Sequence, residues 1–466
     1  MPLDNSQRPF APAPPQEGLG SYSTQGKRRW IEPVTSPGRY HTRRLVLAIV
    51  LIAVFLAAPH IQVSGHPLLH FDLAQRLFHI LGVTFHPTDN RILVAFGLLV
   101  VLTLFTVTAL FGRLWCGYFC PQPVFLEFIF RPIEALLEGP PEDRRRAHEA
   151  PRLPALPRKL LKWTIYVVLS SVIAHTLIAI FTGWSAIAGL MQDGPAAHAP
   201  LFVFTWIITG FLFVDFASFR ENVCTMMCPY GRLQTALYDR DTRIVGYDSA
   251  RGEPRGRPKN GPAGDCIDCR RCVGTCPTGI DIRRGLQMEC IGCAECVDAC
   301  DAIMKKIKRP PGLIRYTSLE VLGGGKTSLL RRRVVVYGVL WTAAFCTLAW
   351  LLTHRAVAET DILRAAHEPY RELPSGEVAN QLRFRFMNRM DQDQDFEVTL
   401  LAPSEGKLIV SQVPFTVAPQ HVEALNVAVI LPSTAFSNGR TDARFRVTGN
   451  VGYQEEKSIL LLGPYQ

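Results

Sequence analysis

The chain has 466 residues, of which 48% are hydrophobic and only 19% are charged, and its formal net charge is +10. This length accommodates two or three folding units, and the composition favours a protein that is partly embedded in a membrane. Most of the positive charge flanks apolar segments, as is typical at a membrane surface, so we expect no nucleic-acid partner.

Residues 1–42 are rich in Pro, Gly, Ser and Gln and are predicted to form a disordered arm. No apolar segment with a small-residue cleavage site follows the start, so we expect the first apolar helix to remain as an anchor. Five apolar runs follow, each close to the ~20 residues that a helix needs to cross a bilayer. They are Leu45–Val63, Ile92–Phe111, Trp163–Gly183, Pro200–Phe216 and Val334–Thr353.

These runs predict a five-helix transmembrane bundle, with four helices within residues 43–240 and the fifth within 331–355. Lys and Arg are concentrated before the first run and between the second and third, whereas residues 184–200 contain none. Because basic residues near helix ends are retained in the cytoplasm, the N-terminus is expected inside and the C-terminus outside.

Thirteen cysteines need an explanation, and twelve of them fall on the predicted cytoplasmic side, where metal ligation is favoured over disulfide bonding. The remaining one, Cys346, lies inside the last apolar run and is expected to be a small packing residue.

Residues 241–330 contain "CIDCRRCVGTCP" at 266–277 and "CIGCAECVDAC" at 290–300, both with the C-x2-C-x2-C-x3-C spacing of bacterial ferredoxins. Three thiolates of each run bind one cluster, and the fourth reaches the other. The segment is therefore predicted to be an α+β ferredoxin-like domain that relays single electrons; a zinc array is the alternative. The predicted ligands are Cys266, Cys269, Cys272 and Cys300 for one 4Fe-4S cluster, and Cys290, Cys293, Cys296 and Cys276 for the second.

Two further cysteine pairs follow the second and fourth apolar runs, in "CGYFCPQP" at 116–123 and "CTMMCPYGRLQ" at 224–234. Residues four apart share one face of a helix, and both helices run inward, so the four thiols are expected to converge. Soft thiolates and thioethers select Cu(I), zinc or iron–sulfur clusters. The predicted metal and catalytic ligands are Cys116, Cys120, Cys224 and Cys228, with Met226 and Met227 as additional candidates.

Other interpretations of these pairs stay open. The cysteines could be buried free thiols or a redox-active disulfide. For the two methionines, packing between helices is favoured over ligation, because methionine readily fills gaps in a bundle.

The C-terminal segment, residues 356–466, differs in character from the rest of the chain. From about Gln381 it shows short alternating runs bounded by Pro, Gly, Asn and Asp, which are typical of half-buried strands. Six or seven strands predict an all-β immunoglobulin-like sandwich that serves for docking or stabilisation.

The order of these features resembles the CcoG/FixG/RdxA family of cytochrome c oxidase accessory proteins, over nearly all of the chain beyond residue 40. The resemblance implies a multi-pass protein of the bacterial inner membrane, with its clusters in the cytoplasm and its C-terminal domain in the periplasm. It implies two 4Fe-4S clusters as cofactors and copper as the substrate of a cupric reductase that converts Cu(II) to Cu(I) for assembly of a cbb3-type oxidase. The implied partners are a cytoplasmic electron donor, a copper chaperone or exporter and oxidase assembly factors; a homodimer is left open.

Two other functions use the same motifs. A quinol-linked membrane ferredoxin would conduct electrons to another respiratory reductase, although the predicted outer sandwich contains no redox ligand to receive them. A non-enzymatic scaffold for oxidase assembly, or a redox sensor, would need the clusters only to report oxygen or iron status.

Overall fold

The computed structural model describes residues 30–63, 66–73, 77–80, 82–86, 89–144, 156–256, 264–364, 369–390, 392–450 and 452–465, together with Ser21 and Arg28. The chain divides into two compact units, residues 1–348 and 349–466.

Five helices among the described residues are long and apolar enough to cross a membrane, which confirms the predicted number. Their bounds are α1 Arg39–Ala57, α2 Asn90–Phe111, α7 Leu156–Thr182, α9 Ala199–Val214 and α15 Arg332–Thr353, and α9 continues as the π-helix η4, Asp215–Phe219. The first predicted span, Leu45–Val63, was misplaced by six residues at both ends. Helix α1 ends at Ala57 with Ala58 as its cap, and Pro59 follows directly, where a proline cannot continue the helix.

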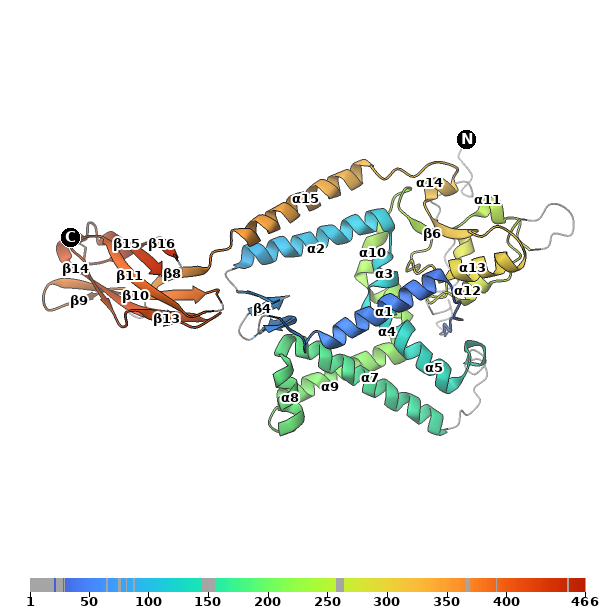
Figure 1. The fold of residues 1–466 in the computed structure, drawn as a ribbon, viewed down its shortest axis with the longest axis horizontal. Coiled ribbons are helices and arrows are strands. Elements are labelled where there is room, and N and C mark those ends of the chain that lie inside the picture. The colour runs from blue at the N-terminus through green and yellow to red at the C-terminus, as the bar shows by residue number, and fades with distance from the viewer. Residues whose placement is uncertain are drawn as a thin grey trace. The chain divides into compact units, whose positions relative to one another are not determined.

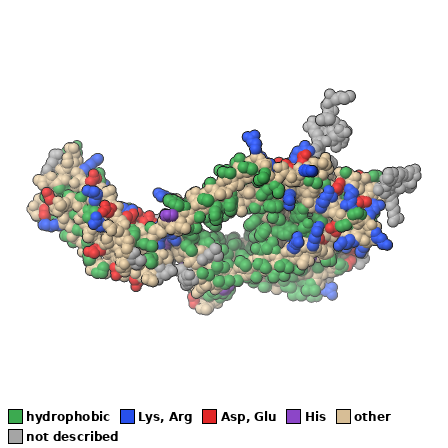
Figure 2. Space-filling model, turned by 45° about the horizontal axis from the view of Figure 1, so that its top comes forward, with side chains coloured by type: hydrophobic (Ala, Val, Ile, Leu, Met, Phe, Trp, Pro, Cys, Tyr) green, Lys and Arg blue, Asp and Glu red, His purple; other side chains and the backbone are tan. Residues whose placement is uncertain are grey.

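The spanning helices form two groups of neighbours in the first unit (Figure 1). Helix α7 packs against α9, and α1 also contacts α7. Helix α15 lies beside α2, where the Trp341 indole donates a 2.8 Å hydrogen bond to the Thr103 hydroxyl. Broad apolar surface covers these helices (Figure 2), and side chains such as Val94 and Val339 are each 62% exposed. Such a surface is suited to lipid rather than water.

Several short elements connect the spanning helices and were not predicted. Two small sheets lie between α1 and α2, with strands β1 Gln62–Val63, β2 His66–Pro67, β3 Leu69–Asp72, β4 Leu77–Ile80 and β5 Val83–Phe85. Short helices occupy the remaining connections: α3 Leu114–Tyr118, α4 Pro121–Phe125, η3 Leu126–Phe130, α5 Arg131–Glu138, α8 Trp184–Asp193, η5 Val223–Met227 and α10 Pro229–Ala236.

The predicted α+β module is present between α10 and α15. Its two strands, β6 and β7, pair in antiparallel fashion. The elements are β6 Ile244–Tyr247, α11 Ser249–Gly252, α12 Arg271–Gly274, η6 Ile282–Arg284, α13 Glu295–Lys306, β7 Ile314–Thr317 and α14 Leu319–Leu322. Its apolar core includes Val245, Val297 and Met304 and packs directly around the cysteines of both runs.

The end of the predicted disordered arm is ordered against this module, which corrects the prediction for residues 30–42. The Val34 amide donates to the Gly274 carbonyl at 2.9 Å, and the Thr275 hydroxyl donates to the Val34 carbonyl at 2.7 Å. The Asp298 carboxylate accepts the backbone N–H groups of Tyr40 and His41 at 2.9 and 2.8 Å. Thus a carboxylate from the module satisfies free amides at the start of α1. Apart from Ser21 and Arg28, the earlier part of the arm lies outside the described residues.

The second unit is a β-sandwich with nine strands among its described residues, more than the six or seven predicted. One sheet has the order β12–β14–β10–β8 with β9 also on β10, and the other has the order β13–β11–β15–β16. The bounds are β8 Ala358–Arg364, β9 Arg371–Glu372, β10 Glu377–Asn388, β11 Gln394–Ala402, β12 Lys407–Val410, β13 Phe415–Val417, β14 Val422–Pro432, β15 Arg440–Gly449 and β16 Gln454–Leu462. Phe384, Phe386 and Phe445 fill the space between the sheets.

Candidate functional site

The two ferredoxin-type runs have the same backbone conformation around their second cysteine. In the first run Asp268 and Arg270, on either side of Cys269, have φ of 54° and 53°. In the second run the equivalent residues are Gly292 and Ala294, with φ of 70° and 61°. These left-handed positions curl each loop tightly. The curl allows three sulfurs of one short loop to point toward one centre.

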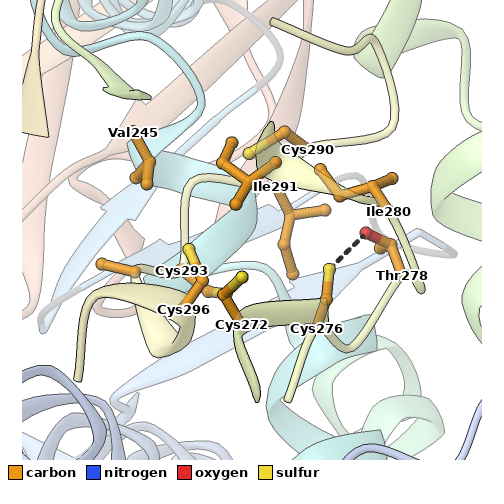
Figure 3. A pocket seen from close by; sticks show the side chains of 11 residues that line it. Val245, Cys272, Cys276, Thr278, Ile280, Cys290, Ile291, Cys293 and Cys296 are labelled. Carbon is orange, nitrogen blue, oxygen red and sulfur yellow. Dashed lines mark hydrogen bonds between the residues drawn. The ribbon is translucent and has the colours of Figure 1, made fainter. Parts of the chain in front are cut away.

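The cysteines of the two runs line two pockets. The first cysteine pocket is lined by Cys266, Cys269, Cys272 and Cys300, and the second by Cys276, Cys290, Cys293 and Cys296, with Cys272 at the boundary between them. Each pocket thus receives three cysteines of one run and the last cysteine of the other. Figure 3 shows the second pocket, where apolar side chains such as Val245 and Ile280 surround the sulfurs and Thr278 contacts the Cys276 sulfur at 3.4 Å.

The donor set and the spacing of the sulfurs fit a polynuclear cluster. Among the described residues, no three His, Cys, Asp or Glu side chains lie close enough to share one metal ion. Four thiols that line one apolar pocket without meeting at one point suit a 4Fe-4S cluster, in which each sulfur binds a different iron. A zinc array needs only four ligands around one ion, so it gives no reason for the third cysteine and the x3 offset that both runs share.

The C-x3-C-P pairs lie where helices break, rather than on one continuous helical face as predicted. Cys116 is in α3 and Cys120 stands between α3 and α4. Cys224 is in η5, and Cys228 immediately precedes α10. In both motifs the following proline is the first residue of the next helix, where its missing N–H costs nothing. The second cysteine of each pair therefore sits at the start of a new helix.

The two motifs are tied together by a reciprocal pair of glutamines. Gln122, which follows the first pair, donates to the Arg220 carbonyl at 3.1 Å and to the Asp215 carboxylate at 3.0 Å, just before the second pair. Gln234, which follows the second pair, accepts a 3.3 Å hydrogen bond from the Cys116 sulfur. Gln234 is fully buried. Each glutamine thus links the motif it follows to the other motif.

We refer to Cys116, Cys120, Cys224 and Cys228 as the four-thiol site. The thiols of the two motifs are near enough to interact electrostatically, since Cys224 is affected by all three of the others. Burial raises the pKa of Cys116 to about 12, and the neighbouring Arg113 guanidinium opposes this rise. The Cys116 thiol therefore stays protonated until a metal displaces its proton.

Arg113 occupies a position between the two groups of cysteines. Its side chain is only 5% exposed, it donates to the Gly231 carbonyl, and no described carboxylate lies within 4 Å of it. Burial raises the pKa of Cys290 to about 11, and the positive charge of Arg113 opposes this rise. A buried cation without a carboxylate needs another source of negative charge. The cysteines on either side of Arg113 would provide that charge as thiolates once they bind a metal.

The loop of the first motif touches the second ferredoxin-type run directly. A Cβ atom placed on Gly117 would lie 2.8 Å from the Ile291 carbonyl oxygen and 3.1 Å from both N and Cα of Cys293. Arg44 of α1 secures this contact, since it donates to the Gly117 carbonyl at 2.9 Å and to the Glu295 carboxylate at 2.7 Å. The four-thiol site and the second cysteine pocket are therefore adjacent.

A buried ion-pair network supports the second motif. Arg220, whose φ is 51°, makes contacts of 2.9 and 3.1 Å with the Glu134 carboxylate, which also accepts from Arg144 at 3.0 Å. Arg131 contacts the Glu221 carboxylate at 3.3 Å and the Pro277 carbonyl at 3.2 Å. The network thus joins α5, the start of the second motif and the end of the first ferredoxin-type run.

Several of these residues were not identified from the sequence. The glutamines were visible as a shared feature of both motifs, but nothing in the sequence indicated that each would reach the other motif. Arg44 and Arg113 appeared to be ordinary cytoplasmic flanking charges. The methionines, in contrast, gain no support as ligands, because Met227 is 57% exposed and Met226 is half-buried.

Family models match three segments of the chain. Residues 219–319 match a "4Fe-4S dicluster domain", residues 93–140 a "4Fe-4S binding domain", and residues 348–464 an "IG-like fold at C-terminal of FixG". Together with the five apolar helices, these matches define a membrane iron–sulfur electron-transfer protein with an immunoglobulin-like C-terminal unit.

Three curated proteins are similar over most of their length. The chain is 31% identical over 388 residues to protein RdxA of Cereibacter sphaeroides, covering 79% of this chain and 82% of the relative. It is 31% identical over 416 residues to RdxB of the same organism, covering 85% and 87%. It is 29% identical over 465 residues to the nitrogen fixation protein FixG of Rhizobium meliloti, covering 88% of each chain. The chain therefore belongs to the FixG/RdxA family, which confirms the resemblance and the predicted fold class.

Proposed function

We propose that this membrane iron–sulfur protein reduces Cu(II) to Cu(I) at the four-thiol site, for assembly of the copper centre of a cbb3-type oxidase. In this proposal Cys266, Cys269, Cys272 and Cys300 hold one 4Fe-4S cluster, and Cys276, Cys290, Cys293 and Cys296 hold the other. Each cluster, when bound, supplies one-electron redox chemistry. One electron from a cytoplasmic donor converts one Cu(II) to one Cu(I).

The observation that carries the proposal is the direct contact between the Gly117 loop and the second ferredoxin-type run. It brings a soft-ligand site within reach of a cysteine pocket suited to electron transfer. Thiolates favour the cuprous state, so the four-thiol site would stabilise the product more than the substrate. The buried Gln234 accepts a hydrogen bond from the Cys116 sulfur, and the buried Arg113 donates to the Gly231 carbonyl of the second motif.

The proposed orientation places the N-terminus, both cysteine pockets and the four-thiol site in the cytoplasm, and the C-terminal unit in the periplasm of the inner membrane. It rests on the distribution of Lys and Arg in the connecting segments. The product Cu(I) would then pass to a copper chaperone or exporter that serves the oxidase assembly factors.

The test uses full-length protein in membranes, reduced anaerobically and freed of excess reductant before Cu(II) is added. A chromogenic Cu(I) chelator then reports the product. Replacement of Cys116, Cys120, Cys224 and Cys228 by serine should abolish Cu(I) formation while the cluster signals in electron paramagnetic resonance persist. Cys346→Ser, in α15 and away from both motifs, is the matched control. Equal Cu(I) yields from the two variants would refute the assigned site.

A second candidate is that the four-thiol site holds a further iron–sulfur cluster. Two observations favour it: the "4Fe-4S binding domain" match at residues 93–140 contains Cys116 and Cys120 but no ferredoxin-type cysteine, and no three described thiols converge on one ion. Iron analysis of the purified protein separates the candidates, because a third cluster adds four iron atoms that the quadruple serine variant loses.

The quinol-linked conduit and the non-enzymatic scaffold or redox sensor predict different results. Oxidation of quinol without any dependence on copper would favour the conduit. Oxidase assembly that persists after loss of the cluster ligands would favour a scaffold.

A further inference from the structure

The two ferredoxin-type runs share one conformation but face different surroundings. In the second run Gly292 lies against the Arg113 backbone, with its Cβ position 3.2 Å from the Arg113 carbonyl oxygen, and Ala294 is 1% exposed. In the first run the equivalent residues are Asp268 and Arg270, and both are exposed. The second pocket is therefore enclosed by the membrane motif, whereas the loop of the first pocket faces solvent.

The solvent-facing loop combines an exposed sulfur with apolar and basic side chains. Cys269 is exposed, and Ile267 beside it is 39% exposed. Four exposed arginines belong to this loop and to the segments before and after it, and we call them the basic rim: Arg255, Arg270, Arg271 and Arg284. Figure 2 shows Lys and Arg side chains crowded on this module, in contrast to the apolar surface of the helices.

The carboxylates near the rim are already engaged. Arg283 donates to the Asp268 carboxylate and contacts the Asp281 carboxylate at 2.8 Å. Arg271 and Arg284, in contrast, have no carboxylate within 4 Å among the described residues. Of the other two rim arginines, Arg255 lies 3.6 Å from the Glu253 carboxylate and Arg270 lies 3.7 Å from the Asp268 carboxylate. Arg271 and Arg284 therefore supply the uncompensated positive charge near the exposed Cys269.

We infer that the basic rim is the docking surface for a small, acidic, one-electron carrier protein, which delivers electrons at Cys269. This inference rests on the proposed function, in which the second pocket adjoins the copper site and the first pocket must therefore face the donor. Opposite charges steer a transient partner to the site, and small apolar contacts such as Ile267 suffice for brief encounters. An anionic lipid surface would match the charge but gives no reason for an exposed cysteine at its centre.

The test measures the first electron step without copper. Full-length protein in nanodiscs is mixed anaerobically with reduced flavodoxin, an acidic flavoprotein, and the loss of cluster absorbance gives the rate. Each carrier loses one electron and the protein gains one. The same measurement with dithionite in place of flavodoxin corrects each variant for changes in the cluster itself. The quantity compared is the rate with flavodoxin divided by the rate with dithionite.

Arg271→Glu combined with Arg284→Glu should lower this ratio roughly tenfold and flatten its dependence on ionic strength. The matched control makes the same charge change on exposed residues of the sandwich, Arg383→Glu with Arg385→Glu, and should leave the ratio unaltered. Equal ratios in the two variants would overturn the inference, as would a ratio that depends on the lipid charge of the nanodisc but not on the rim.

Failure of this inference is distinguishable from failure of the proposed function. Copper reduction is measured separately with protein that has been reduced beforehand, so it needs no docked carrier.

Discussion

The close contact between the C-x3-C-P loop and the ferredoxin-like module predicts that Gly117 tolerates no side chain. In Gly117→Ala the new Cβ would lie 2.8 Å from the Ile291 carbonyl oxygen, whereas ordinary contacts begin at 3.4 Å. The two loops must therefore separate by about 0.6 Å, and both partners are backbone atoms that cannot rotate away. Overpacking of this kind costs typically about 1–3 kcal/mol.

We expect a lower midpoint of thermal unfolding, measured by the loss of cluster absorbance. We also expect protein that has been reduced beforehand to form Cu(I) more slowly. Gly97→Ala is the matched control, because its Cβ position in α2 has no atom within 4 Å and alanine is the better helix former. If Gly117→Ala and Gly97→Ala have the same thermal midpoint and the same Cu(I) rate, the loops do not depend on this contact and the reasoning fails.

Three further predictions address the buried cation, the grouping of the cysteines and the sandwich. Arg113→Met should lower the reduction potential of the nearest metal centre by roughly 90 mV in a redox titration. The reason is that a buried cation, at an effective dielectric of about 20, stabilises the reduced centre by on the order of 2 kcal/mol. An unchanged potential would contradict the role of Arg113 as a counter-charge. Cys276→Ser should change the same electron paramagnetic resonance signal as Cys290→Ser, and a change in the signal altered by Cys266→Ser instead would refute the grouping. Asn380→Ala should destabilise the C-terminal unit by about 1–3 kcal/mol in chemical denaturation, because its side chain exchanges two hydrogen bonds of 2.9 and 3.0 Å with the backbone of β16; an unchanged midpoint would show that these bonds are replaced by water.

The sequence predicted features that depend on local pattern. A run of about 20 apolar residues must form a helix in lipid whatever its neighbours are, so the number of spans was correct. Their ends were less certain. Arg43 and Arg44 limit the first uncharged run to Leu45, yet both lie within α1, and Arg44 is buried and paired with Glu295. A charged residue can lie within a spanning helix when a partner from another segment balances its charge.

Side-chain pairing between distant segments escaped prediction for a related reason. Gln122 of the first motif bonds the Arg220 carbonyl beside the second motif, and Gln234 of the second motif bonds Cys116 of the first. Arg220 binds Glu134, 86 positions away in the chain, rather than the nearby Asp215. Such choices depend on how close two backbones come, and no periodicity or spacing encodes that distance.

The sequence by itself determined that this is a multi-span membrane protein with two ferredoxin-type runs, because chain length across a bilayer and the reach of a short cysteine loop are local constraints. Only the tertiary structure decided which run faces the membrane motif. Both runs have the same spacing and the same left-handed backbone. Gly292 is small enough to lie against the Arg113 backbone and Ala294 is buried, whereas Asp268 and Arg270 are exposed. The direction proposed for electron flow rests on that difference in size and charge.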